Sequence, residues 1–301
     1  MFVAERASVV AALLFAVHPV HTEAVTGVVG RAESLSSAFF LLALIAYTHS
    51  ARRWKRTRWS CLLACVLLIA VATLCKEQGI TVVGVCVIYE LFVVQQLRPR
   101  NMAHIIQTVL ASKSSPPEWL RELFIRLGVL FFSALALLVA RVKVMGAQLP
   151  VFTKFDNPSA VAETPARQLT FNYLLPVNLW LLLFPSELCC DWTMGTIPLV
   201  ESFFDIRNLA TVALYIGLGA LIFVAVSTVD TISANVIAVS LSLIVFPFVP
   251  ASNLFFPVGF VVAERILYMP SMGFCLLVAH GWQRLLDRGY PFARFNLYNK
   301  D

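Results

Sequence analysis

The sequence has 301 residues, of which 59% are hydrophobic and only 13% are charged. A soluble domain carries about 25% charged residues, so this composition excludes an ordinary water-soluble protein and predicts an all-α polytopic membrane protein. The net charge of +6 does not indicate a nucleic-acid partner, because the basic residues stand in short blocks beside apolar segments. The seven cysteines have no metal-ligand spacing, and no cofactor-binding motif is present.

The chain opens with an apolar run of 11 residues, 7–17, that is too short to cross a bilayer by itself. Because no small-x-small cleavage site follows it, we expect a truncated helix rather than a signal peptide. The stretch 98–121, which contains Pro116-Pro117, predicts a flexible loop. Further along the chain, membrane crossings are expected near 34–50, 60–75, 80–97, 122–142, 207–226, 232–249 and 267–284.

The charge pattern sets the orientation of these crossings. Five basic residues and no acid lie between 51 and 59, so this loop is expected on the cytosolic side. Segment 171–185 is short and contains Pro176, and a crossing there would put the basic C-terminal tail in the lumen. We therefore expect a re-entrant or interfacial segment within a lumenal loop at 144–206, with a crossing as the alternative. The loops that then share the lumenal face are 18–33, 76–79, 144–206 and 250–266.

The first polar cluster predicted for this face follows the opening apolar run. If 20–33 is one helix, Glu23 and Arg31 share a face, because they lie two four-residue steps apart. Imidazole, carboxylate and guanidinium groups at a membrane boundary suit a phosphate site or a proton donor, and a salt-bridged scaffold is the alternative. The cluster comprises His18, His21, Glu23, Arg31 and Glu33.

Two further charged pairs belong to the same face. Lys76 and Glu77 are adjacent, so on a helix they point to different partners; a shared network and a self-neutralising hairpin both remain open. Glu264 and Arg265 interrupt an apolar stretch, where ionisable groups are functional candidates. Arg265 is suited to a bidentate phosphate contact, with Glu264 as its orienting partner or as a helix-stabilising acid.

The long lumenal loop carries two polar motifs with structural interpretations. Asp156-Asn157-Pro158 is a strong turn signal, so Asp156 is expected to shape a turn. Asp191-Trp192, followed by Gly195, predicts a loop held at the membrane surface by an interfacial tryptophan.

Taken together and in order, these motifs resemble one family, the transmembrane O-mannosyltransferases targeting cadherins. The matching sequence motifs are His-Pro-Val-His-Thr-Glu-Ala-Val at 18–25, Gly-Arg-Ala-Glu at 30–33, Lys-Glu-Gln-Gly-Ile-Thr at 76–81, Phe-Asp-Asn-Pro at 155–158, Asp-Trp-Thr-Met-Gly-Thr-Ile-Pro-Leu at 191–199, Pro-Ala-Ser-Asn-Leu-Phe-Phe at 250–256 and Ala-Glu-Arg at 263–265.

The resemblance implies a partial family C glycosyltransferase (GT-C) fold over 1–301, with about seven to nine membrane helices or re-entrant segments. It implies a multi-pass protein of the endoplasmic reticulum membrane that transfers mannose from dolichyl phosphate mannose to Ser or Thr of cadherin-type acceptors. The family's first helix, its first lumenal loop with an acidic pair expected to act as catalytic base, and its tetratricopeptide repeats find no match here. We therefore expect a fragment that is inactive alone, and we assign no catalytic residue.

Within this family resemblance, charge and position nominate the site residues. The candidate donor-phosphate contacts are Arg31, Lys76 and Arg265, since a lipid phosphodiester needs cationic partners. The candidate supporting residues are His18, His21, Glu23, Glu33, Glu77 and Glu264. The expected partners are dolichyl phosphate mannose, cadherin-type proteins and membrane lipid, with no metal, cofactor or nucleic acid. A polytopic transporter and a non-catalytic membrane scaffold are the rival functions.

Overall fold

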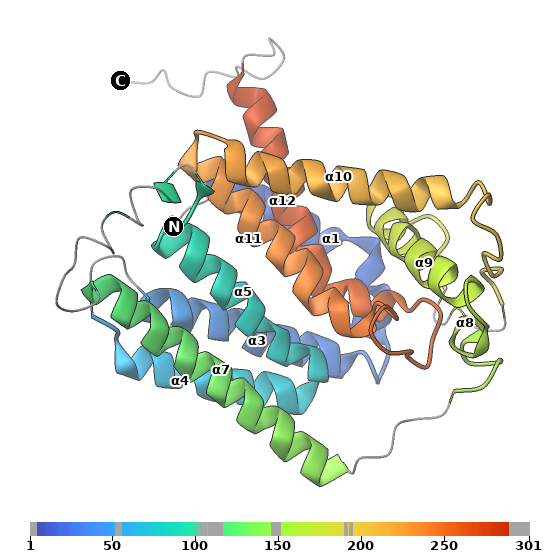
Figure 1. Cartoon of the computed structure of the whole chain (residues 1–301), viewed down its shortest axis with the longest axis horizontal. Coiled ribbons are helices and arrows are strands. Elements are labelled where there is room, and N and C mark those ends of the chain that lie inside the picture. The colour runs from blue at the N-terminus through green and yellow to red at the C-terminus, as the bar shows by residue number, and fades with distance from the viewer. Residues whose placement is uncertain are drawn as a thin grey trace.

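The computed structural model describes residues 5–51, 56–99, 101–102, 107, 117–145, 152–189, 192 and 195–288. Over these residues the chain forms helices joined by loops, and Trp192 and Val262 make one isolated β-bridge (Figure 1). The predicted all-α class is confirmed.

Each predicted crossing coincides with helical structure. Local chemistry explains two boundaries. The Asp230 side chain accepts a hydrogen bond from the Ile232 N–H at 3.0 Å and caps the start of the helix 231–248. The helix 59–75 ends where Lys76 adopts an extended backbone conformation. The helices are α3 (Arg31–Ser50), α4 (Trp59–Cys75), α5 (Val82–Ile88) with its π-helical continuation η3 (Tyr89–Val94), α7 (Glu118–Met145), α10 (Asn208–Ser227), α11 (Thr231–Phe248) and α12 (Tyr268–Asp287).

By length and composition, four helical stretches of the described chain can cross a membrane: Glu77–Val94, Glu118–Val144, Asn208–Ser227 and Thr231–Ala251. The first begins with η2 (Glu77–Thr81) and the last ends with η4 (Val249–Ala251). The helix α4 is apolar but has 17 residues, and α3 and α12 carry charged residues near their ends. These three helices lie at predicted crossings, but each lacks either the length or the apolar composition required of a candidate span.

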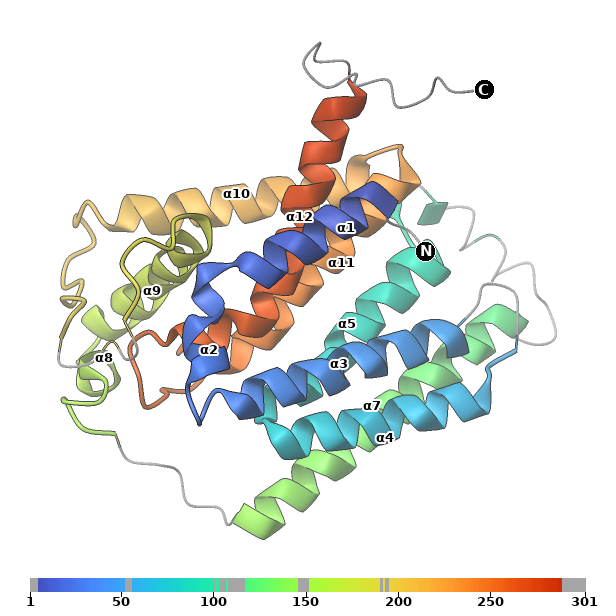
Figure 2. The same cartoon turned by 180° about the vertical axis from the view of Figure 1, so that it is seen from behind.

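The N-terminal apolar run forms a helix, as predicted. It is α1 (Glu5–Val17), followed by η1 (Pro19–His21) and α2 (Thr22–Thr26). The two parts are bent by 51° and would make a fifth span if they count as one. The bend falls at His18-Pro19, where His18 Nδ1 accepts the Val20 N–H at 3.3 Å in place of a helical bond. Figure 2 shows α1 lying along α12.

The segment predicted at 171–185 is part of a longer helix. After the short α8 (Pro158–Val161), α9 (Ala166–Leu183) runs for 18 residues with Pro176 inside it. It lies beside α10 at one end of the molecule (Figure 1). It is not among the four candidate spans. Whether it crosses or lies at the interface therefore stays a prediction.

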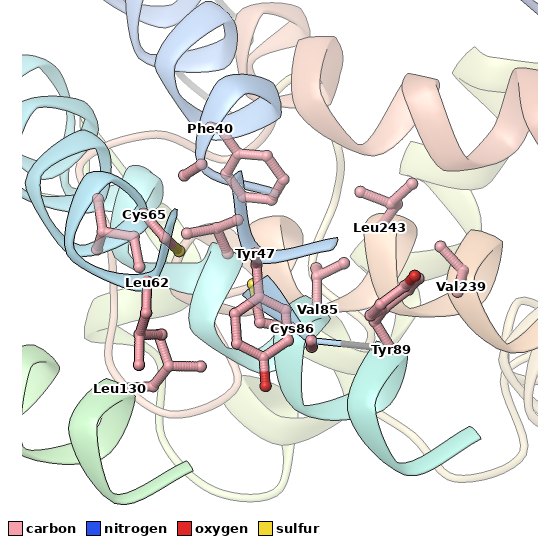
Figure 3. Packing of buried hydrophobic residues seen from close by; sticks show 14 of the residues in the cluster. Phe40, Tyr47, Leu62, Cys65, Val85, Cys86, Tyr89, Leu130, Val239 and Leu243 are labelled. Atoms are coloured by element: carbon pink, nitrogen blue, oxygen red, sulfur yellow. The ribbon is translucent and has the colours of Figure 1, made fainter. Parts of the chain in front are cut away.

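The core is built around α11, whose residues 233–243 are all buried. One apolar cluster packs α11 against α3, α4, α5 and α7, with Phe40, Leu62 and Leu243 among its members (Figure 3). A second cluster lies under the loops at one end and joins Val20, α9 and the segment that leads into η5 (Glu264–Leu267). This second cluster supports the charged motifs.

The predicted loop 98–121 and the basic residues Arg52, Arg53 and Lys55 lie largely outside the described residues. At the start of that loop, Arg98 is buried and donates to Asn235 Oδ1 at 2.7 Å and to the Thr231 carbonyl at 3.1 Å. The prediction of a flexible loop is therefore wrong at Arg98, because α11 holds its side chain.

Candidate functional site

The strongest link between distant motifs joins Glu23 in α2 to Arg265 in η5. The Arg265 guanidinium donates to Glu23 Oε1, and the Arg265 backbone N–H donates to Glu23 Oε2 at 2.8 Å. Two hydrogen bonds to one carboxylate fix both the side chain and the backbone of Arg265. The first and last predicted clusters thus meet in space.

A second ion pair joins the start of α3 to the end of α4. Lys76 Nζ lies 3.0 Å from Glu33 Oε1, and Glu33 is fully buried. In such a low-dielectric position a carboxylate needs its cation, since a buried unpaired charge is strongly destabilising. Lys76 therefore holds the α3–α4 hairpin as well as carrying a candidate site charge.

Glu77 faces a different partner. Arg141 near the end of α7 donates to Glu77 Oε2 at 2.9 Å and to the Thr73 carbonyl at 3.3 Å. The prediction that Lys76 and Glu77 serve different partners is confirmed. Arg141 was not singled out from the sequence, because its partner lies 64 residues away.

The pairs are close enough to interact. The Glu33 carboxylate is acted on electrostatically by Lys76, Glu77 and Arg265 together. Lys76 and Glu77 pair with Glu33 and Arg141 rather than with each other, which favours the network alternative over a self-neutralising hairpin. We call the following residues the ion-pair cluster: Glu23, Glu33, Lys76, Glu77, Arg141 and Arg265.

Glu264 is buried beside this cluster, and the alternative in which it orients Arg265 is wrong. Glu264 Oε1 accepts the Cys189 N–H at 2.6 Å and the Trp192 Nε1–H at 3.3 Å. Burial raises the pKa of the Glu264 carboxyl, and these two donors oppose that rise. Trp192 is therefore tied inward to Glu264 rather than simply anchoring the loop at the membrane surface. Glu264 positions the loop that contains Trp192.

The two histidines are committed to the framework. His18 Nε2 lies 3.1 Å from the Leu182 carbonyl oxygen of α9, while its Nδ1 accepts the Val20 N–H. His21 is buried, with Nε2 2.8 Å from Ser271 Oγ of α12. The Ser271 hydroxyl also donates to the Tyr268 carbonyl, so His21 is linked to the first turn of α12. Both side chains support the site, which agrees with the scaffold alternative for them.

The predicted single helix over 20–33 is wrong. The helix α2 ends at Thr26, Gly27 is extended, and α3 starts at Arg31. A Cβ at Gly30 would lie 2.5 Å from the Ala24 Cα, so the turn folds tightly back on α2. Glu23 and Arg31 consequently do not share a helical face. Arg31 is exposed, and its side chain has no hydrogen bond or ion pair with the part of the chain that the structure describes.

The turn predicted at Asp156-Asn157-Pro158 is confirmed. Asp156 Oδ2 accepts the Thr153 N–H at 3.0 Å and the Thr153 hydroxyl at 2.7 Å, and these bonds hold the pKa of its exposed carboxyl below the usual value. The neighbouring Asn157 is fully buried and donates to Asn253 Oδ1 and to the carbonyls of Val258 and Phe260. Asn157 thus ties the loop before α8 to the loop after α11.

A second charged network lies at the opposite end of the same helices. Arg126 donates to Glu90 from two nitrogens, and the Tyr47 hydroxyl donates to Glu90 at 2.9 Å. Glu90 lies in the π-helical turn η3, a distortion that is frequent at functional sites. The idea that unusual charges gather on one face is therefore wrong. On α3, the buried Phe40 and Ala43 lie between the two ends, so an apolar layer separates the networks.

The fold and site define a polytopic helical membrane protein with a partly buried ion-pair cluster, in which three loop motifs meet the end of α7. Residues 146–219 match the family described as "Protein O-mannosyl-transferase TMTC, DUF1736". The chain is 59% identical to protein O-mannosyl-transferase TMTC3 of Mus musculus, over 96% of the chain and 31% of the mouse protein. The corresponding human protein is 58% identical over 95% of the chain and 31% of its own length, and the Drosophila melanogaster Tmtc3 is 53% identical over 93% and 32%.

The chain is therefore a homologue of the TMTC family of protein O-mannosyl-transferases over nearly its whole length, as the motifs indicated. It spans about a third of the length of these relatives. No solved structure matches the fold.

Proposed function

We propose that this chain forms the lipid-donor side of a protein O-mannosyltransferase in the endoplasmic reticulum membrane. In this proposal the ion-pair cluster and Arg31 face the lumen and bind the phosphate of dolichyl phosphate mannose. The mannose is transferred to Ser or Thr of cadherin-type proteins. The names of the TMTC relatives support the reaction type, and the donor, the acceptor and the compartment follow from the family resemblance.

The observation that carries the proposal is the convergence of the charged motifs at one end of the membrane helices. Glu23–Arg265 and Glu33–Lys76 join segments that are far apart in sequence, and the Arg265 charge reaches Glu33. Arginine side chains at a bilayer surface suit a donor whose phosphate is charged and whose tail is apolar.

The cationic side chains of this site differ in how many of their N–H donors remain available to a phosphate. Arg31 has no partner among the described residues, and Arg265 uses one guanidinium nitrogen for Glu23, which leaves other N–H donors. Lys76 is held by the buried Glu33. We therefore assign direct phosphate contacts to Arg31 and Arg265, while Lys76 contributes charge at the rim and keeps α3 in place.

The acids and histidines position these cations. Glu23 orients Arg265, Glu264 fixes the loop of Trp192, and His18 and His21 lock the α1–α2 turn to α9 and α12. Glu77 keeps Arg141, and with it the end of α7, against the cluster. No catalytic base is assigned to the described residues.

The apolar layer between the two charged networks favours this proposal over a transporter. A transporter needs a polar pathway that reaches both faces, whereas buried Phe40 and Ala43 separate Glu33 from Tyr47 on α3. The scaffold alternative predicts that removing the free cations has no effect on mannose transfer.

The test uses a protein of the relatives' full length that contains these 301 residues, expressed in cells without other O-mannosyltransferases of this type. Removal of a charge-assisted phosphate contact costs about 1.5–3 kcal/mol, so Arg31→Ala and Arg265→Ala are expected to lower cadherin O-mannose occupancy about tenfold or more. Occupancy is measured by mass spectrometry at equal protein abundance.

Two comparison variants keep the test specific. Arg58→Ala removes an exposed arginine from the α3–α4 loop at the opposite end and is expected to leave occupancy unchanged. Arg265→Lys keeps the charge but loses the planar fork, so it is expected to fall between wild type and Arg265→Ala. Full occupancy in both alanine variants would remove the phosphate role from this cluster.

A further inference from the structure

Two loops expose bulky apolar side chains beside the membrane helices. The first precedes α10 and presents Phe203, Phe204 and Ile206, of which Phe204 is 98% exposed. The second follows α11 and η4 and presents Leu254, Phe255 and Phe256, of which Phe255 is 74% exposed. Single exposed apolar residues are common on protein surfaces, but two groups of three are not explained in that way.

The first loop is held in this shape by its own polar groups. Asp205 and Arg207 pair at 2.6 Å, and the Arg207 guanidinium also donates to the carbonyls of Pro198 and Leu199. The Asn208 amide donates to the carbonyls of Ser202 and Phe203 at 3.0 Å each. Asp205 and Arg207 are thereby held by each other and by the loop backbone, while the rings of Phe203 and Phe204 stay exposed.

The second loop is fixed from beneath. Asn253, with a positive φ of 59°, accepts the Val258 N–H at 2.9 Å and the Asn157 amide at 3.0 Å through its Oδ1. An asparagine tolerates this left-handed conformation better than most residues. Leu254, Phe255 and Phe256 follow directly, so the buried asparagine pair directs three apolar side chains outward.

The chain path places the two loops on one side of the membrane. The helices α10 and α11 are joined by the short turn 228–230 and pack against each other, so they run in opposite directions. The start of α10 and the end of α11 therefore lie at the same bilayer face. The helix α10 also exposes nearly its whole surface, with Thr211 and Ala225 as its buried residues, as expected for a helix surrounded by lipid.

We propose that these loops, 203–206 and 254–256, insert into the boundary between headgroups and acyl chains of the leaflet on the side of the ion-pair cluster. Aromatic side chains at the ends of spanning helices favour this layer, which takes up the rings while the loop backbone stays near water. Arg265 follows the second loop by nine residues, so insertion sets the cluster at headgroup depth. The occupant of these surfaces is lipid, and the inference holds whatever reaction the cluster supports.

The test replaces Phe204 or Phe255 with p-benzoylphenylalanine in the full chain, reconstituted in phosphatidylcholine nanodiscs. After irradiation, mass spectrometry of the labelled peptides is expected to show acyl-chain adducts at both positions. The matched control carries the same residue at Glu163, an exposed acid in the loop between α8 and α9, and is expected to give several-fold fewer lipid adducts.

Adducts at 204 and 255 that are no more frequent than at 163 would overturn the proposal. Cross-links to a second copy of the chain or to another protein would do the same, because they would identify a protein as the occupant. Both substitutions replace exposed rings by a similar ring, and unchanged gel-filtration profiles check that the variants fold.

Discussion

Asp156 and Asn157 are neighbours in sequence but have opposite structural roles. Asp156 closes a turn on Thr153, whereas Asn157 is buried and its amide nitrogen lies within hydrogen-bond distance of three oxygens of the loop after α11. The sequence predicted the turn, because Asp-Asn-Pro favours one locally. It did not predict the bond to Asn253, which lies 96 residues away.

This contrast gives a stability prediction. Asn157→Ala leaves buried acceptors unpaired and is expected to lower the free energy of unfolding by about 2–3 kcal/mol. Asp156→Ala, the matched neighbour, removes exposed bonds and is expected to change stability far less. Thermal unfolding in detergent, followed by intrinsic fluorescence, measures both. Equal destabilisation by the two variants would show that the buried amide does not brace the loops.

The charged candidate residues, like Asn157, have long-range partners that the sequence did not predict. The sequence identified Glu23, Glu33, Lys76 and Arg265 as unusual, since charges beside apolar segments are costly. It did not identify their partners, because Glu23 and Arg265 are 242 residues apart. Arg126 and Glu90, which form the second network, lay inside predicted apolar segments and were not singled out.

At the scale of elements, the helices were predicted well and their breaks less well. Long apolar runs forced helices because unpaired backbone groups are unfavourable in a bilayer. The break between α2 and α3 was missed: the repeat of Glu23, Gly27 and Arg31 fits a helix, but Gly27 is extended and Gly30 packs directly on Ala24. The close packing of the turn on α2 overrode the periodicity there.

Two glycines of α12 test how closely this helix packs. A Cβ at Gly273 would lie 2.3 Å from the Ser240 carbonyl oxygen of α11, whereas a Cβ at Gly281 meets nothing within 4 Å. Gly273→Ala is therefore expected to destabilise the protein by about 1–3 kcal/mol through overpacking.

Gly281→Ala is the matched control in the same helix. It is expected to be neutral or to stabilise by about 0.4–1 kcal/mol, because alanine restricts the unfolded chain. The unfolding temperatures of the two variants and of wild type, measured in the same detergent, test how closely α12 packs on α11. A Gly273→Ala protein as stable as wild type would mean that α11 and α12 are not held at the described separation.

At the scale of the whole molecule, the ion pairs constrain the topology. Glu23–Arg265 and Glu33–Lys76 require the loops after α1, after α4 and after α11 to share one face. The charge rule predicts that this face is the lumenal one. The Glu90–Arg126 network lies at the other end of α5 and α7, beside the basic loop between α3 and α4.

Reporter insertion tests this orientation. A hydrophilic insert with an N-glycosylation acceptor after Glu187 is expected to be glycosylated in microsomes, and the same insert within 228–230 is expected to remain unmodified. Sensitivity to endoglycosidase measures both. Glycosylation at 228–230, or its absence after 187, would reverse the assigned face and separate the ion-pair cluster from a lumenal sugar donor.

The sequence by itself determined that this protein is a helical membrane protein, where most helices lie and which charged motifs are unusual. These properties depend on composition and on the free energy of placing local chain segments in a bilayer. The tertiary structure decided which charges pair, where the chain turns back at Gly27–Gly30, that His18 and His21 contact α9 and α12, and that a second network lies at the opposite end. Those outcomes depend on contacts between residues far apart in the chain, and local hydrophobicity and spacing do not encode such contacts.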